Sequence, residues 1–245
     1  MRVSHYKLLM CGQPSFRAIR ETLPEIEFQA GAERGFILDK ETNLNRVKGR
    51  YVYTQVGKAT TLDPETLEKK EEETRSLTEC RFEIDQQKGL VSVEQRRGEL
   101  NALFEALDAI PNVNIAFEDM NLNLPPLLFE IQRAYKKNEL KSVRIRDYLA
   151  RENMLTNANF KILEAQEAEK IVEKFDEQID SFTLSLKLPD GAIALTVTKK
   201  GTVRASDDAP DEVLLFVKEL LPRFHEAEVE TTQALDPVAA RKKRR

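Results

Sequence analysis

The stretch of residues 182–221 constrains the fold more than any other part of the chain. Apolar and polar residues alternate from Phe182 to Leu188, which is the period of a β-strand with one buried face. Asp190-Gly191 then precedes a second alternating run, and Asp-Gly is a strong hairpin signal because glycine adopts positive φ without a Cβ clash. A third short strand follows, and then a helical stripe over residues 213–221. The sequence therefore predicts a β-meander closed by an amphipathic helix.

The same order of strand, turn, strand and helix recurs over residues 77–110, with few identities between the two copies. The polar stretch 57–76 carries a run of glutamates, which is typical of a solvated helix or linker. The other predicted elements are strands over 5–11, 26–29, 35–39, 49–56, 113–117 and 140–148 and helices over 16–22, 98–109, 127–135 and 164–179. These elements predict an α+β protein of mostly antiparallel β-sheets, built from hairpins that are each closed by amphipathic helices.

Four segments follow from this pattern. Residues 1–76 are predicted to hold the N-terminal strands, a short helix and the charged linker. Residues 77–160 hold the first hairpin-helix unit and a basic strand, and residues 161–224 hold a helix and the second hairpin-helix unit. Apolar periodicity fades after Pro222, so residues 225–245 are predicted to be a disordered basic tail.

Composition limits the class of protein. The 245 residues are enough to bury a core without metal or disulfide staples, and 33% of them are charged, with a net charge of −4. Cys11 and Cys80 are too few for a secreted disulfide framework, and no apolar run reaches the ~18 residues of a membrane span. We therefore expect a cytoplasmic protein.

Motifs for catalysis are absent from the sequence. It has no glycine-rich phosphate loop and no nucleophile elbow, and its two histidines, His5 and His225, are far apart. Pro189-Asp190 could begin a nuclease motif, but no Glu-x-Lys follows on the next strand, and a turn explains these residues. Cys80 alternates with apolar residues and is expected to be buried and inert. We expect no enzyme activity, no cofactor and no metal.

Basic side chains give the one positive signal. Arg144 and Arg146 are two residues apart on a predicted strand, so they project from one face about 6 to 7 Å apart, near the phosphate spacing of nucleic acids, with Tyr148 continuing the row. The candidate nucleic-acid-binding residues are Arg133, Lys136, Lys137, Lys141, Arg144, Arg146 and Arg151, then Lys199, Lys200 and Arg204 after the second hairpin. The tail residues Arg241, Lys242, Lys243, Arg244 and Arg245 could tether the protein to a polyanion.

Three segments carry a resemblance to known families. LSLKLPDGAIALTVTKKGTVRA with its following helix resembles the C-terminal portion of the RexA phage-exclusion proteins, and CRFEIDQQKGLVSVEQ and GRYVYTQVGK occur in a similar order. The fold that this implies is also similar to that of the RdgC recombination-associated proteins. The resemblance implies a dimeric, non-enzymatic protein that binds double-stranded DNA with little sequence preference, in phage defence or recombination control, together with an effector protein. It implies no catalytic residue.

A second interpretation uses the same features. An exposed strand and charged helices also suit a non-catalytic scaffold or inhibitor subunit that binds another protein and never touches DNA. An enzyme of unrecognised type ranks third.

Overall fold

The structure is a computed structural model that describes residues 2–10, 13–40, 42–62, 69–94, 99–113, 115–151 and 154–226. Its helices are α1 (Gln13–Thr22), α2 (Glu99–Asp108), α3 (Leu124–Ala134), α4 (Ala165–Lys174) and α5 (Asp211–Leu220). Its strands are β1 (Arg2–Met10), β2 (Arg34–Leu38), β3 (Arg46–Leu62), β4 (Lys69–Asp85), β5 (Leu90–Glu94), β6 (Ala116–Asp119), β7 (Asn138–Arg151), β8 (Met154–Lys161), β9 (Ile179–Leu188), β10 (Gly191–Thr198) and β11 (Thr202–Ala205).

These strands form one sheet in the order β2-β3-β4-β5-β1-β11-β10-β9-β7-β8, with β6 also paired to β1. All pairings between the named strands are antiparallel. The predicted α+β class with antiparallel hairpins is therefore confirmed. Both predicted hairpin-helix units, β4-β5-α2 and β9-β10-β11-α5, contribute their strands to this single sheet.

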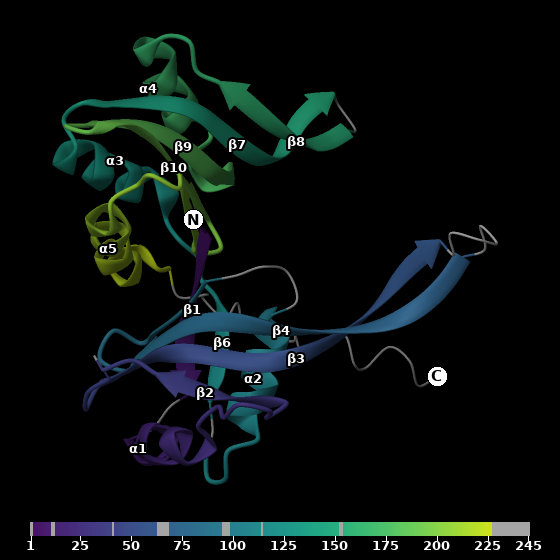
Figure 1. The fold of residues 1–245 in the computed structure, drawn as a ribbon. Helices are drawn as coiled ribbons and strands as arrows, with labels where there is room; N and C mark the ends of the chain where they lie inside the picture. The colour runs from purple at the N-terminus through teal and green to yellow at the C-terminus, as the bar shows by residue number, and fades with distance from the viewer. Residues whose placement is uncertain are drawn as a thin grey trace, which may run out of the picture.

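Strand β1 joins the two halves of the sheet (Figure 1). One of its edges pairs with β5, and the other pairs first with β11 and then with β6. Gly201, at the turn before β11, has φ +80° and lies so close that a Cβ there would be 2.6 Å from the carbonyl oxygen of His5. The first strand of the chain thus pairs with the C-terminal meander, although the paired residues are about two hundred positions apart in sequence.

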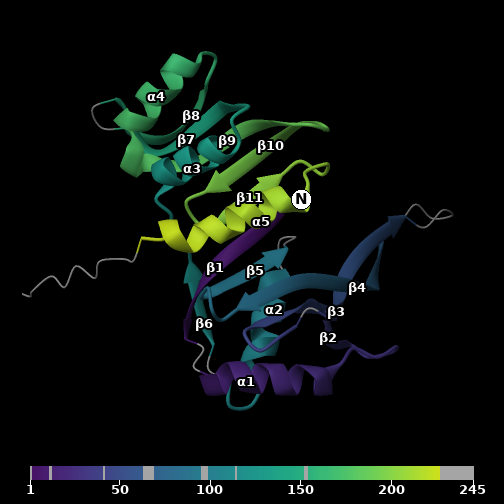
Figure 2. The same ribbon diagram turned by 90° about the vertical axis from the view of Figure 1, so that its left-hand side faces the viewer.

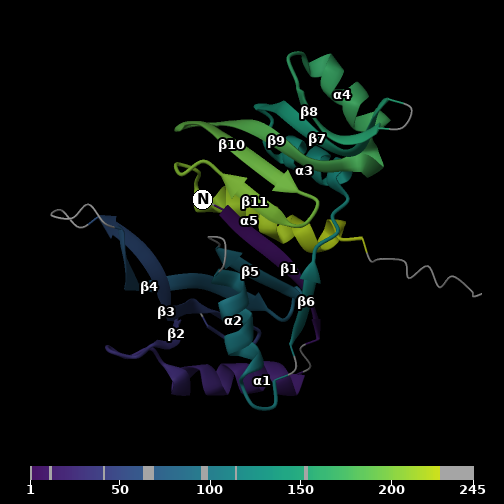
Figure 3. The same cartoon turned by 90° about the vertical axis from the view of Figure 1, so that its right-hand side faces the viewer.

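The two halves bury opposite faces of the sheet. In the N-terminal half, Phe82, Ile84, Val91 and Val93 lie in a core with α1 and α2. In the C-terminal half the apolar side chains of β7, β9, β10 and β11 point the other way and pack with α3, α4 and α5. Figure 1 shows α3 and α5 to the left of the upper strands, and Figure 3, seen from the right, shows the strands in front of those helices. Each half therefore leaves one face of the sheet without a helix of its own, although α5 lies beside that face of the N-terminal half, where Lys218 pairs with Glu83.

The described parts of the stretch 57–76 are strands, so the prediction of a helix or linker was wrong for them, and residues 63–68 lie outside the description. Residues up to Leu62 belong to β3 and those from Lys69 belong to β4, and the paired ends form a two-stranded arm that projects from the sheet (Figure 2). Opposite charges face each other across the arm, as in the Lys58–Glu71 ion pair with 3.2 Å between Nζ and Oε2. Because both faces of the arm meet water, its sequence lacks the apolar alternation that marks a half-buried strand.

Several boundaries also differ from the predictions. The strand predicted at 26–29 does not form: Ile26 ends a short 3-10 helix (Leu23–Ile26), and of the remaining residues only Glu27 makes a β-bridge, to Phe36. The helix predicted over 164–179 ends at Lys174, and Ile179 already begins β9. Helix α5 begins after Pro210, a residue that provides no side-chain cap. The strand predicted at 113–117 lies at Ala116–Asp119, and β8 was not predicted at all.

Candidate nucleic-acid interface

The uncovered face of the C-terminal half carries two rows of polar side chains that cross six strands. Directly opposed residues of neighbouring strands lie on one face of a sheet, so the pairings define each row. One row contains Arg2, Arg204, Thr196, Thr183, Ser142 and Lys161, and the next contains Ser4, Thr202, Thr198, Ser181, Arg144 and Asn159. With neighbouring strands about 4.8 Å apart, each row spans about 24 Å. We call these twelve residues the hydroxyl–arginine face.

The hydroxyl–arginine face contains four cations and no carboxylate. Arg2 and Arg204 lie directly opposite each other, and among the described residues neither has an ion pair. The Nε of Arg2 is buried and has no hydrogen-bond partner. Like charges that face each other across strands are destabilising. A bound anion would relieve this repulsion and would accept hydrogen bonds from guanidinium N–H groups.

Hydroxyl groups fill the centre of the face. Thr183 and Thr196 hydrogen-bond through their hydroxyls at 2.9 Å, and Ser4 and Thr202 do so at 3.3 Å. Thr183, Thr196 and Thr202 are partly exposed, and a hydroxyl carries one donor and two acceptor positions, so these threonines keep hydrogen-bonding capacity for a ligand, whereas Ser4 is buried. Serine, threonine and arginine are side chains that contact phosphate oxygens in protein–DNA complexes.

Arg144 and Arg146 point outward from β7, as predicted, and share one carboxylate. Asp180, at the start of β9, accepts a hydrogen bond from Arg146, and its Oδ2 lies 3.8 Å from Nε of Arg144. All three side chains are at least partly exposed. The single negative charge of Asp180 therefore neutralises only one of the two positive charges of Arg144 and Arg146. This group of three side chains keeps a net positive charge.

Tyr148 does not continue this row, so that part of the prediction was wrong. Asp147 has φ +53°, and the ladder between β7 and β8 shifts between Ile145 and Tyr148, which marks a β-bulge. The bulge turns Tyr148 to the helix-covered side, where its ring contacts those of Phe160 and Phe175. A bulge of one residue reverses the side on which every later side chain points, and the i, i+2 rule could not anticipate it.

The structure does not bring the other predicted cations into one row. Arg133 lies on α3, on the opposite side of the sheet, and pairs with Glu130. Lys136 and Lys137 are exposed in the connection before β7, and Lys141 pairs with Glu139. Lys199 donates to the carbonyl of Glu177 at the turn after β10, and Lys200 pairs with Asp119. The side chain of Arg151 and the five basic residues 241–245 of the tail lie outside the description.

The uncovered face of the N-terminal half forms a different site, a cleft of about 600 Å³ beside α5. On its wall Nδ1 of His5 lies 2.9 Å from Oγ of Ser92, and Nζ of Lys218 lies 2.6 Å from Oε1 of Glu83. Burial, together with the charge of Lys218, lowers the pKa of His5 from 6.5 to about 3. An imidazole with so low a pKa is a weak general base, so this serine–histidine pair is better suited to joining β1 to β5 than to activating a nucleophile.

His5 is thus a buried junction residue, and His225 is also ordered. Nδ1 of His225 accepts a hydrogen bond of 3.2 Å from the backbone N–H of Asn121, and burial lowers its pKa. The prediction that His225 belongs to a solvated tail was wrong, whereas residues 227–245 lie outside the description. Cys80 is fully buried, as predicted.

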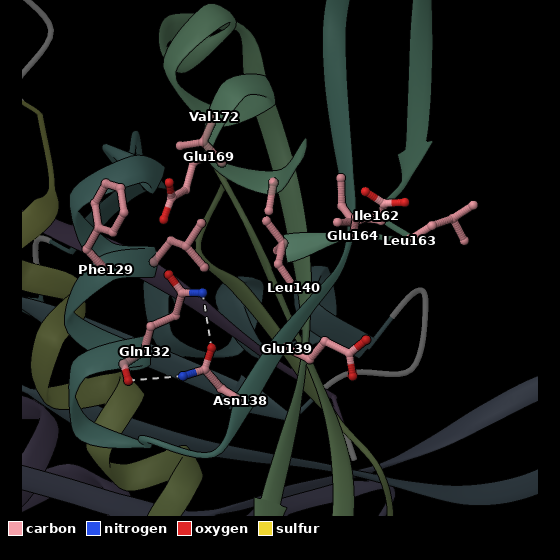
Figure 4. A pocket seen from close by; sticks show the side chains of 12 residues that line it. Phe129, Gln132, Asn138, Glu139, Leu140, Ile162, Leu163, Glu164, Glu169 and Val172 are labelled. Atoms are coloured by element: carbon pink, nitrogen blue, oxygen red, sulfur yellow. Dashed lines mark hydrogen bonds between the residues drawn. The ribbon is translucent and has the colours of Figure 1, made fainter. Parts of the chain in front are cut away.

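A smaller cavity of about 170 Å³ lies on the helix-covered side, between α3, the start of β7 and α4 (Figure 4). Three carboxylates line it, from Glu139, Glu164 and Glu169. Its amide groups already bond each other, since Gln132 donates to the side chain of Asn138 and Asn138 donates to the backbone of Gln132. The carboxylates make this cavity unsuitable for a polyanion.

No protein-family model matches the chain, and no curated protein matches its sequence. In the part of the chain that the structure describes, no helix is long and apolar enough to cross a bilayer, and no three acidic, histidine or cysteine side chains are grouped to hold a metal ion.

Proposed function

We propose that this protein binds double-stranded DNA through the hydroxyl–arginine face, without sequence preference and without catalysis. The observation that carries the proposal is the pair of carboxylate-free rows, in which Arg2 and Arg204 face each other and form no ion pair with any residue that the structure describes. Guanidinium and hydroxyl donors on a rigid sheet suit backbone phosphates, which hold a duplex without reading its bases.

The composition of the face favours a duplex over a single strand. Proteins that hold single strands stack bases on aromatic side chains. Neither row of the hydroxyl–arginine face contains an aromatic residue, and the nearby rings of Tyr148 and Phe160 pack on the other side of the sheet. Phosphate contacts without base stacking are the pattern that a duplex requires.

The biological setting follows from the resemblance described above. A RexA-like or RdgC-like protein would act in the cytoplasm as a homodimer, in phage defence or recombination control, together with an effector protein. The runner-up is a scaffold that binds a protein partner only. A partner recovered in a pull-down at stoichiometric amounts, despite nuclease treatment, would favour that alternative.

Titration of unrelated fluorescent duplexes of equal length tests the function. We expect similar affinities for all of them, with roughly a 100-fold loss between 50 mM and 200 mM salt if about four phosphates are neutralised. Fluorescence anisotropy measures both quantities. Absence of binding at 50 mM salt, or strong preference for one sequence, would contradict the proposal.

Asp180 provides a test in which a substitution strengthens binding. Asp180→Asn removes the carboxylate that Arg144 and Arg146 share, so both guanidinium groups become available to phosphate. We expect affinity for duplex DNA to rise about 3- to 10-fold, which corresponds to the roughly 1 kcal/mol of an exposed ion pair. The matched control is Glu130→Gln, which frees Arg133 on α3 and should leave affinity unchanged. Equal or weaker binding by Asp180→Asn would remove this pair from the interface.

A further inference from the structure

The tip of the β7–β8 hairpin carries an exposed apolar pair. Leu149 and Leu155 are directly opposite each other in the ladder, and 59% and 65% of their surfaces are exposed. Single exposed leucines are common on protein surfaces and indicate nothing by themselves, so the case for a contact rests on where this pair lies. Its position relative to the hydroxyl–arginine face indicates what it contacts.

The leucine pair lies on the same side of the hairpin as the arginines. Tyr148 packs inward against Phe160 and Phe175, and successive residues of a strand point to opposite faces, so Leu149 points outward. Closer to the sheet, the outward positions are Arg144 and Arg146. One surface of the hairpin therefore passes from cationic to apolar along its length.

We propose that Leu149 and Leu155 form a wedge that enters the minor groove of the bound duplex and partly unstacks one base step. This inference rests on the proposed function. Leucine is one of the side chains that proteins insert between base steps, and such wedges bend the duplex toward the major groove by 20–90°. Counted along β8, Leu155 is four residues from Asn159, the partner of Arg144, so at about 3.4 Å per residue the wedge lies roughly 14 Å from Arg144, about four base pairs along the duplex. The arginines hold the phosphates while the wedge opens the stack.

The charges around the leucine pair favour DNA, and not a second copy of the chain, as its binding partner. A contact that laid the hairpins of two copies side by side in parallel would bring the arginines of both copies together, because the cations are on the same surface as the leucines. Against a duplex the same cations meet phosphates. The cations of the hairpin thus match the phosphates of a duplex, and the leucines match its apolar interior of stacked base pairs.

A bending measurement on the full chain tests the wedge. A duplex labelled with a donor and an acceptor at its ends should show increased energy transfer with the wild-type protein, corresponding to a bend of at least about 20°. Leu149→Ser together with Leu155→Ser should abolish the bend, while the slope of affinity against salt stays the same. The matched control is Val56→Ser together with Leu77→Ser, which removes a similarly exposed apolar pair from the β3–β4 arm and should leave the bend intact.

The possible outcomes separate this inference from the proposed function. Wild-type binding without bending, or bending that survives the double leucine substitution, overturns the wedge and leaves DNA binding in place. Failure of the wild-type protein to bind any duplex overturns both. If the leucine substitutions instead convert a dimer to a monomer in size-exclusion chromatography at unchanged bending, the pair is a contact between copies.

Discussion

Arg144→Glu together with Arg204→Glu is expected to weaken duplex binding by more than about 100-fold at low salt. Each charge-assisted hydrogen bond to phosphate contributes about 1.5 to 3 kcal/mol, and 1.4 kcal/mol corresponds to a tenfold change in affinity. The two residues lie in adjacent rows on β7 and β11, so they would contact separate phosphates. The slope of log affinity against log salt should also become shallower by about 2.

The control for this variant has the same change of charge elsewhere. Arg17→Glu together with Arg133→Glu replaces exposed arginines on α1 and α3, each of which pairs with a glutamate of its own helix. Both double variants should have wild-type circular dichroism and melting temperature. Binding that is equally weak in the two variants would mean that net charge, and not the hydroxyl–arginine face, controls affinity. Unchanged binding in Arg144→Glu, Arg204→Glu would show that the face is not the interface.

Acid is expected to destabilise the protein strongly through His5. The folded-state pKa of His5 is about 3, below the 6.5 of the unfolded chain, because burial and the charge of Lys218 oppose protonation. Above pH 6.5 the imidazole is neutral in both states and contributes no pH dependence. As the pH falls from 6.5 toward 3, only the unfolded chain takes up the proton, so the free energy of unfolding decreases by about 1.4 kcal/mol per pH unit. At pH 4.5 the loss from this residue alone is about 2 to 3 kcal/mol.

Urea unfolding at pH 7.5, 6 and 4.5 measures this effect when wild type is compared with His5→Asn. The asparagine variant is expected to be less stable at pH 7.5, but its stability should fall by about 2 to 3 kcal/mol less between pH 7.5 and pH 4.5, because it lacks the buried imidazole. His225→Asn is the control, since His225 is only partly buried and should change the pH dependence by less. Parallel curves for wild type and His5→Asn would contradict the assignment. The residue matters because β1 joins both halves of the sheet.

The elements with a buried face were predicted well. Apolar spacing alone predicts the β9–β10 hairpin and the helices α2, α3 and α5. This spacing is a local property of the chain. The β3–β4 arm and β8 were not predicted, because their side chains largely meet water. Their sequences therefore lack the regular apolar positions from which a half-buried strand is predicted. The common face of Arg144 and Arg146 was also predictable, since it depends only on a separation of two residues.

The sequence by itself determined the α+β class, the hairpins and the pair of outward arginines, because these depend on neighbours within a few residues. Only the tertiary structure decided that Arg2 lies opposite Arg204, that Asp180 sits between Arg144 and Arg146, and that a bulge at Asp147 turns Tyr148 inward and Leu149 outward. Such contacts are set by the register of strands that are distant in the chain, and register is fixed by the packing of both cores together.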